Sequence, residues 1–277
     1  MSKRLPSVVF LLLVIVLLCA GCSIKEDRSE CPCTLVLNLN DVRKEYFSFL
    51  TVRAESSDGF LFQDIVPCSG LSDRLILKVP RTDIRVNVVG EAVMNAIEEG
   101  DDACVPLGEI RNNGSYIIPE WSECPPVYLF MTKVSTVSDL VEVPVSLKKN
   151  YCRISIEMLA VQSYEFGLGI VGNFCGYDVA GRPLPGDFGF SSIIKNGKVV
   201  EVSVPRQEDN SLRMQLSDTG DGGVVREFAL GEYIAAVGYD WAAEELEDIH
   251  VVIDYVRTKI TFKVRDWEKV FEFDVVI

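Results

Sequence analysis

Residues 47–65 read Phe-Ser-Phe-Leu-Thr-Val-Arg-Ala-Glu-Ser-Ser-Asp-Gly-Phe-Leu-Phe-Gln-Asp-Ile, two apolar runs on either side of a turn sequence. The runs, 47–54 and 60–65, have the β-branched and aromatic composition of strands. Asp58-Gly59 lies between them and indicates a hairpin, because glycine adopts positive φ without the steric cost of a Cβ. The stretch therefore predicts an antiparallel pair of strands.

Runs of the same kind recur along the chain, with turn residues between them. They are 34–39, 74–79, 84–92, 127–131, 140–147, 152–159, 165–171, 198–204, 212–216, 224–230, 233–238, 249–256, 259–264 and 269–277. The clearest hairpin signal is in residues 193–200, where Asn196-Gly197 suits a type I′ turn. Helical periodicity is almost absent, and its best candidates are 91–99 and 241–247.

Many short strands with hardly any helix between them favour an all-β fold of antiparallel sandwiches over a parallel α/β sheet. About sixteen strands are too many for one small sandwich and fit two of seven or eight strands each. Lys148-Lys149-Asn150 interrupts two strand-like runs. We therefore expect tandem β-sandwich domains at 34–147 and 148–277.

The amino terminus has the organisation of an export signal. Lys3 and Arg4 precede an apolar run over 8–20, which is shorter than the ~20 residues that span a bilayer as a helix. Ala20-Gly21 then precede Cys22. We expect a lipoprotein signal peptide at 1–21 and a lipidated charged tether at 22–33.

Cys22 is the predicted site of lipid attachment. Each buried methylene contributes about 0.8 kcal/mol, so several acyl chains would hold the body permanently at a membrane. The residue three before the cleavage site is Cys19, where lipoprotein signals usually carry leucine. The alternative is an ordinary secretory signal whose Cys22 forms a disulfide. No other stretch is long and apolar enough to cross a membrane.

The tether continues as Ser23-Ile24-Lys25-Glu26-Asp27-Arg28. It resembles the Lys-plus-acidic signal that sends Bacteroides-type lipoproteins to the cell surface, although a merely solvated tether has the same composition. Removing 21 of 277 residues, Lys3 and Arg4 among them, changes the formal charge from −14 to about −16. So acidic a chain is repelled by nucleic acid and anionic headgroups, which excludes both as general partners.

Nine cysteines are present, and seven remain after Cys19 leaves with the signal and Cys22 takes lipid. The seven are Cys31, Cys33, Cys68, Cys104, Cys124, Cys152 and Cys175. An odd number cannot all pair within one chain, and disulfides are the default expectation after export. One Cys-x-Cys and one histidine make a poor zinc site, so we expect no metal.

Signatures of enzymes are missing: there is no GxSxG, P-loop, HExxH or dinucleotide fingerprint. His250, the only histidine, lies in a strand-like run, where a surface role is the ordinary one. The loop 218–223 has the composition of calcium ligands without the EF-hand spacing. We expect neither catalysis nor a cofactor.

Trp121, Trp241 and Trp267 are the only tryptophans. A glycan-binding sandwich would use exposed aromatic rings, whereas partly buried packing is the more usual role. A surface lipoprotein that binds glycan or another ligand beside a nutrient-uptake system is therefore the alternative function.

Residues 22–33, Cys-Ser-Ile-Lys-Glu-Asp-Arg-Ser-Glu-Cys-Pro-Cys, followed at once by a strand, resemble the start of FimB-type fimbrial anchor lipoproteins of Bacteroidales. Looser resemblance extends to 145–157 and 248–255. It implies two transthyretin-like sandwiches and a subunit that holds a surface fimbrium to the outer membrane and limits its length. The implied partners are fimbrial stalk or accessory subunits.

Fimbriae of this family polymerise by strand exchange, in which a donated strand adds to a neighbour's sheet. Residues 270–277 are expected to be the last strand of their own domain, with an exchanged strand as the alternative. Residues 34–39 are the other candidate, since stalk subunits lose their first strand by proteolysis and anchors generally keep it.

Overall fold

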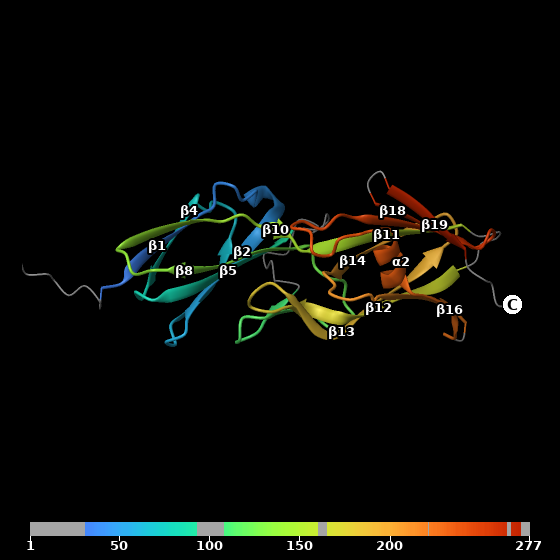
Figure 1. Ribbon diagram of the computed structural model, residues 1–277, viewed down its shortest axis with the longest axis horizontal. Coiled ribbons are helices and arrows are strands. Elements are labelled where there is room, and N and C mark those ends of the chain that lie inside the picture. The colour runs from blue at the N-terminus through green and yellow to red at the C-terminus, as the bar shows by residue number, and fades with distance from the viewer. Residues whose placement is uncertain (1–30, 93–107, 160–164, 221, 265–266, 273–277) are drawn as a thin grey trace, which may run out of the picture.

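The computed structural model describes residues 31–92, 108–159, 165–220, 222–264 and 267–272. Two β-sandwiches lie end to end along the long axis of the molecule (Figure 1). The predicted all-β fold with two tandem sandwiches is confirmed. Most strand pairs are antiparallel, and the exceptions are β1 with β9 and β11 with β17, which run parallel.

The first sandwich contains a three-stranded sheet, β4-β1-β9, and a five-stranded sheet, β10-β8-β5-β2-β3. A 3-10 turn, Lys44–Tyr46, precedes β2. The strands are β1 (Cys33–Asn38), β2 (Phe47–Ser56), β3 (Leu61–Pro67), β4 (Arg74–Val79), β5 (Asp83–Ala92), β8 (Val127–Ser135), β9 (Leu140–Pro144) and β10 (Lys148–Lys149).

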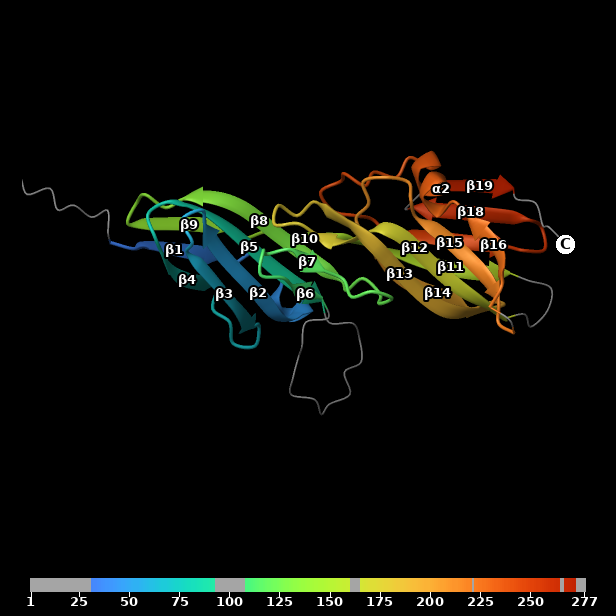
Figure 2. The same cartoon turned by 90° about the horizontal axis from the view of Figure 1, so that it is seen from below.

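The second sandwich pairs the sheet β14-β11-β17-β18-β19 with the sheet β16-β15-β12-β7-β6, and β13 is also paired to β12 (Figure 2). The strands are β6 (Glu109–Ile110), β7 (Tyr116–Ile117), β11 (Tyr151–Leu159), β12 (Glu165–Tyr177), β13 (Pro183–Lys195), β14 (Val199–Pro205), β15 (Arg213–Asp218), β16 (Val224–Phe228), β17 (Ile249–Asp254), β18 (Lys259–Val264) and β19 (Trp267–Glu272).

Strands β6 and β7 join the second sandwich although they precede β8 of the first. Tyr116 and Ile117 pair with Tyr177 and Gly176 at the end of β12. The chain therefore visits the second sandwich once before it returns to complete the first. The predicted boundary between residues 147 and 148 assumes that the chain passes from the first sandwich to the second only once. Sequence pattern could not predict the earlier passage, because β7 is only two residues long.

The predicted hairpin at Asp58-Gly59 is correct, since β2 and β3 pair directly and Gly59 has φ of 92°. The hairpin predicted at 193–200 is wrong. Strand β13 pairs with β12, and β14 pairs with β11 of the opposite sheet. Only Gly197 of the Asn-Gly pair has positive φ, whereas a type I′ turn needs it at both positions. The turn therefore passes the chain from one sheet to the other.

A short helix, α2 (Leu230–Ala236), replaces the strand predicted at 233–238. Leu230 and Ile234, four residues apart, are both buried, so the helix covers one end of the core. Residues 241–247, predicted as helix, form turns. Of the helix predicted at 91–99, residues 91 and 92 end β5 and the remainder lies outside the described residues.

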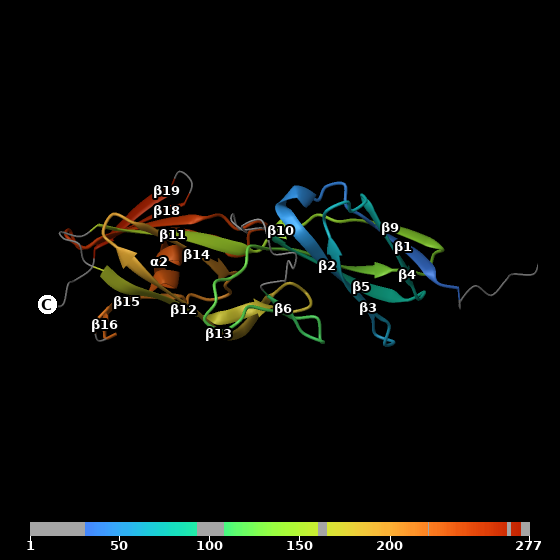
Figure 3. The same ribbon diagram turned by 180° about the vertical axis from the view of Figure 1, so that it is seen from behind.

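The two sandwiches adjoin near β10 and the start of β11 (Figure 3). The core of the second sandwich includes Val127 and Leu129 of β8, which belongs to a sheet of the first. Tyr128, between them, makes edge-to-face contacts with Phe47 of the first sandwich and Tyr151 of the second, at centroid distances of 5.4 and 5.9 Å. Shared apolar packing therefore connects the two sandwiches.

Candidate functional site

Cys22 and residues 22–30 of the predicted tether lie outside the described residues, so lipid attachment remains a prediction. The described chain begins at Cys31, whose carbonyl accepts a hydrogen bond of 2.8 Å from Arg81 Nε. Cys33, the first residue of β1, is fully buried. The body of the protein is therefore firmly packed from the end of the tether onward.

Strand β1 is not a sheet edge, which corrects the prediction of residues 34–39 as an edge strand, and their part in strand exchange stays a prediction. It pairs with β4 on one side and β9 on the other. Leu35 and Leu37 are fully buried in the core of the first sandwich. Removing this strand would uncover both neighbours and open the core, because every backbone group of a central strand is paired.

Strand β19 is an edge strand, paired with β18 and with no other strand among the described residues. Phe271 packs against Tyr233 of α2 at a centroid distance of 4.7 Å. Lys269 donates to the carbonyl of Ala236, 2.7 Å away, and Val270 is 48% exposed. Residues 270–272 thus belong to their own domain's sheet, as predicted, and 273–277 lie outside the described residues.

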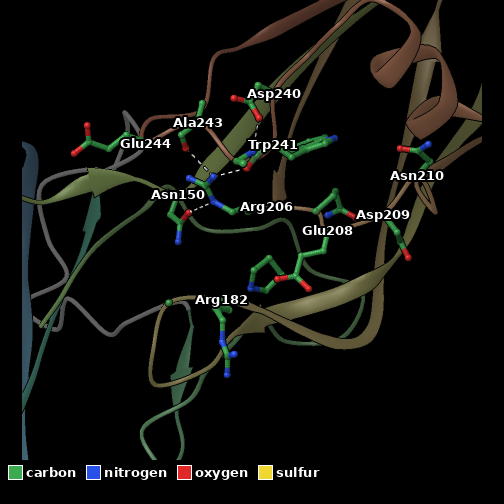
Figure 4. A pocket seen from close by; sticks show the side chains of 14 residues that line it. Asn150, Arg182, Arg206, Glu208, Asp209, Asn210, Asp240, Trp241, Ala243 and Glu244 are labelled. Carbon is green, nitrogen blue, oxygen red and sulfur yellow. Dashed lines mark hydrogen bonds between the residues drawn. The ribbon is translucent and has the colours of Figure 1, made fainter. Parts of the chain in front are cut away.

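A cleft of about 850 Å³ opens between the turn at 181–183, the segment 206–210 and the segment 240–244 (Figure 4). Arg206 lies at its base. Its guanidinium donates to Asn150 Oδ1 at 2.5 Å, to the Ala243 carbonyl at 2.8 Å and to the Trp241 carbonyl. All three acceptors are neutral oxygens.

The electrostatics of this cleft indicate a structural role for Arg206. Burial lowers the pKa of its guanidinium below the usual value. The Tyr177 hydroxyl donates to the backbone carbonyl of Asn150 and accepts a hydrogen bond of 3.0 Å from the backbone N–H of Arg206. Burial also raises the pKa of Tyr177 well above its ordinary value, so the phenol stays protonated. Arg206 therefore connects the 240–244 segment to the sandwich through hydrogen bonds to the Trp241 and Ala243 carbonyls.

None of the six described cysteines forms a disulfide in the structure. Cys31 is exposed, and Cys175 is half-buried. Burial raises the pKa of the Cys124 thiol well above its usual range and that of Cys152 to about 12. These two behave as apolar core side chains, which composition alone could not distinguish from disulfide partners.

Within the described ranges, no group of histidine, cysteine and acidic side chains is arranged to hold a metal ion. The Asp218 carboxylate accepts the Gly220 N–H at 2.6 Å, which is a turn contact. His250 is half-exposed on β17, with Nε2 3.8 Å from Glu157 Oε2. No helix in the described part of the chain is both long and apolar enough to cross a membrane.

The tryptophans occupy different environments. Trp241 is half-buried against Tyr239, with an edge-to-face centroid distance of 4.7 Å, and Trp267 begins β19. Trp121 is 62% exposed and has φ of 60°. The sequence does not distinguish the three tryptophans, whereas the structure shows that Trp121 is exposed and has a left-handed backbone conformation.

No family model matches the chain, and neither does any curated protein. Solved structures do match. A candidate adhesin from Bacteroides ovatus aligns with a TM-score of 0.62 at 13% identity, over 87% of this chain and 95% of its own. A candidate polysaccharide-binding protein from Bacteroides thetaiotaomicron gives 0.60 at 11%, over 88% and 100%.

The fimbrial anchor protein Mfa2 from Porphyromonas gingivalis aligns with a TM-score of 0.57 at 12% identity, over 86% of this chain and 99% of its own. The chain shares its fold with these proteins. The alignments span both sandwiches, so the tandem arrangement is common to all of them.

Proposed function

We propose that this chain is a structural, non-catalytic subunit of a bacterial surface fimbrium, most specifically the lipid-anchored subunit at its base. The observation that carries the proposal is that the start of β1 and the edge strand β19 lie toward opposite ends of the molecule. Strand β1, which follows the predicted tether, starts at one end of the long axis, and the edge strand β19 lies toward the other (Figure 1). A lipid at Cys22 would therefore leave the second sandwich directed away from the membrane.

The shared fold supports this role, because a fimbrial anchor and candidate adhesins have the same tandem sandwiches. Strand β19 offers the chemistry for assembly. An edge strand presents unpaired main-chain donors and acceptors to which a partner's strand can add. Adding a strand there would extend the sheet without disturbing β18.

The junction between the sandwiches suits a subunit that holds a polymer. The Tyr116 hydroxyl donates to Glu91 Oε1 at 2.7 Å, and the Gly108 N–H donates to the same oxygen at 3.1 Å. Glu91 is the last but one residue of β5 of the first sandwich, and Tyr116 belongs to β7 of the second. Buried hydrogen bonds of this kind join the two sandwiches.

The anchor is tested with Cys22→Ala in the native bacterium. We expect the protein and its fimbriae to be shed into the medium, because the acyl chains are lost. Cys31→Ala is the matched control, since Cys31 is exposed and lies nine residues further along the chain. Retention of the Cys22→Ala protein on cells, or unchanged fimbrial length after deletion of the gene, would contradict the proposal.

The partner surface is tested with a photo-crosslinking amino acid at Val270, with the same residue at Val137 as control. Both side chains are exposed, at 48% and 64%, but Val137 lies in the first sandwich. We expect a crosslink to another fimbrial subunit from position 270 only. Equal crosslinking from both positions, or none from 270, would show that β19 is not the contact.

A further inference from the structure

A second cleft, of about 380 Å³, lies on the second sandwich beneath Trp121. Its lining comes from β12, β13, the start of β15 and the turn that carries Trp121. The volume is within the range of roughly 300–1,000 Å³ found for small-molecule sites. This cleft is separate from the cleft of Arg206 and from the β19 edge.

Trp121 is held in a conformation that is costly for a residue with a side chain. It occupies the third position of a turn closed by the Ser122 N–H on the Pro119 carbonyl, at 3.2 Å. A φ of 60° there favours glycine and costs other residues about 1–2 kcal/mol. Because 62% of the residue is exposed, burial does not account for a tryptophan at this position. Residues in strained backbone conformations cluster at ligand-binding and catalytic sites, so Trp121 is a candidate for a functional role.

A glycine of β13 lets the indole lie directly on the sheet. A Cβ on Gly189 would lie 2.7 Å from Trp121 Cε3, so the ring rests directly on the backbone of β13. Gly189 pairs with Val171 of β12, which pairs in turn with Arg213 of β15. Val171 lines the cleft, and the next position on the same face of β12 is Gly169, which pairs with Gln215.

The polar groups on the far side of the floor share one hydrogen-bond partner. Glu227 of β16 accepts Arg213 Nη1 at 3.2 Å through one carboxylate oxygen and Gln215 Nε2 at 2.8 Å through the other. Gln215 Oε1 consequently faces the floor, 3.6 Å from where a Cβ of Gly169 would be. A planar amide and a guanidinium thus lie across the cleft from the indole.

We infer that this cleft binds a neutral glycan. A sugar ring has an apolar C–H face, which matches an exposed indole, and a rim of hydroxyls, which matches amide and guanidinium groups. Glu120 and Asp187 also line the cleft, and Glu227 already compensates the charge of Arg213. The surplus of negative charge disfavours uronic-acid and sulfated glycans.

The position of the cleft argues against a peptide strand as the occupant. A donated strand adds to a sheet edge, whereas this floor is the face of β12, which pairs with β15 over 166–171 and with β13 over most of its length. A glycan needs no main-chain edge. The inference does not depend on the proposed anchor function, because a lipid at Cys22 is compatible with this cleft whether or not it is occupied.

The test is binding of the full chain to an array of neutral oligosaccharides (mannans, xylans, β-glucans and α-glucans) beside polygalacturonate and heparin. Dissociation constants for the neutral probe that binds are then measured by calorimetry for the variants. We expect Trp121→Ala and Trp121→Gly to weaken binding at least tenfold. Trp121→Gly also removes the backbone strain, so it should unfold at a higher denaturant concentration than Trp121→Ala while binding equally poorly.

Tyr46→Ala is the matched control, because Tyr46 is an exposed aromatic residue, at 47%, in the first sandwich. We expect it to bind as the parent protein does. Absence of binding to every neutral probe, or binding that Trp121→Gly leaves unchanged, would overturn the inference. Binding of a fimbrial subunit that Trp121→Gly abolishes, with no glycan bound, would assign the cleft to a protein partner and would also overturn it.

Discussion

Replacing Arg206 by methionine should destabilise the second sandwich substantially. Methionine keeps the length of the apolar stem and removes all the donors. The Asn150 amide oxygen and the carbonyls of Trp241 and Ala243 would then lose a charged donor. These contacts are what attach the 240–244 segment to the sandwich (Figure 4).

The size of the effect follows from two opposing contributions. A hydrogen bond to a charged group contributes roughly 1.5–3 kcal/mol. The cleft is open to solvent, so water can replace some of the lost hydrogen bonds. The variant also avoids the cost of burying a guanidinium, which is the cost that lowers the pKa of Arg206. We therefore expect a loss of about 2–4 kcal/mol, well below the sum of three full hydrogen bonds.

Urea denaturation followed by tryptophan fluorescence suits this measurement. All three tryptophans lie in the second sandwich or in the segment that covers it, and Trp241 is in the perturbed segment itself. The fluorescence transition therefore reports the affected domain separately from the first sandwich. Differential scanning calorimetry should show the same domain shifting to lower temperature.

Arg182→Ala is the matched control, because Arg182 lines the same cleft but is exposed and extends away from Arg206 (Figure 4). Its guanidinium donates only to the Asp178 carboxylate, at 2.6 and 2.9 Å. Exposed ion pairs contribute little, so the midpoint should hardly move. If Arg206→Met changed stability by less than about 0.5 kcal/mol, or if Arg182→Ala matched its effect, the structural role of Arg206 would be refuted.

Three further predictions concern backbone and thiols. Gly176→Ala should cost roughly 2–4 kcal/mol by denaturation, since its Cβ would lie 2.0 Å from the Tyr116 carbonyl oxygen, and a parent-like midpoint would contradict the pairing of β7 with β12. Gly197→Ala should cost only about 1 kcal/mol, because nothing lies within 4 Å and the positive φ is the sole penalty. At pH 8 iodoacetamide should label Cys31 rapidly and Cys152 only after unfolding, because burial raises the pKa of the Cys152 thiol to about 12 and keeps it protonated; equal labelling by mass spectrometry would disprove this.

Local pattern predicted most of the strands because their apolar runs match the requirements of a packed sheet. The run 74–79 became β4 with the same bounds, and 47–54 became most of β2. Pattern failed at 233–238, where an apolar segment became helix α2. The apolar residues of such a short segment fit the periodicity of a strand or of a helix. The helix forms because it packs Leu230 and Ile234 into the end of the core.

The sequence by itself determined the all-β class, the number of sandwiches and the prediction of Cys22 as the lipid site, since these depend on composition and on spacing along the chain. Tertiary structure decided which strands are edges, that Asn196-Gly197 joins two different sheets, and that the ring of Trp121 packs on Gly189. Pairing partners are selected by contacts between residues far apart in sequence, such as β1 with β9 and β7 with β12. No local pattern carries that information, because the fit of a strand depends on the neighbouring strands against which its side chains pack.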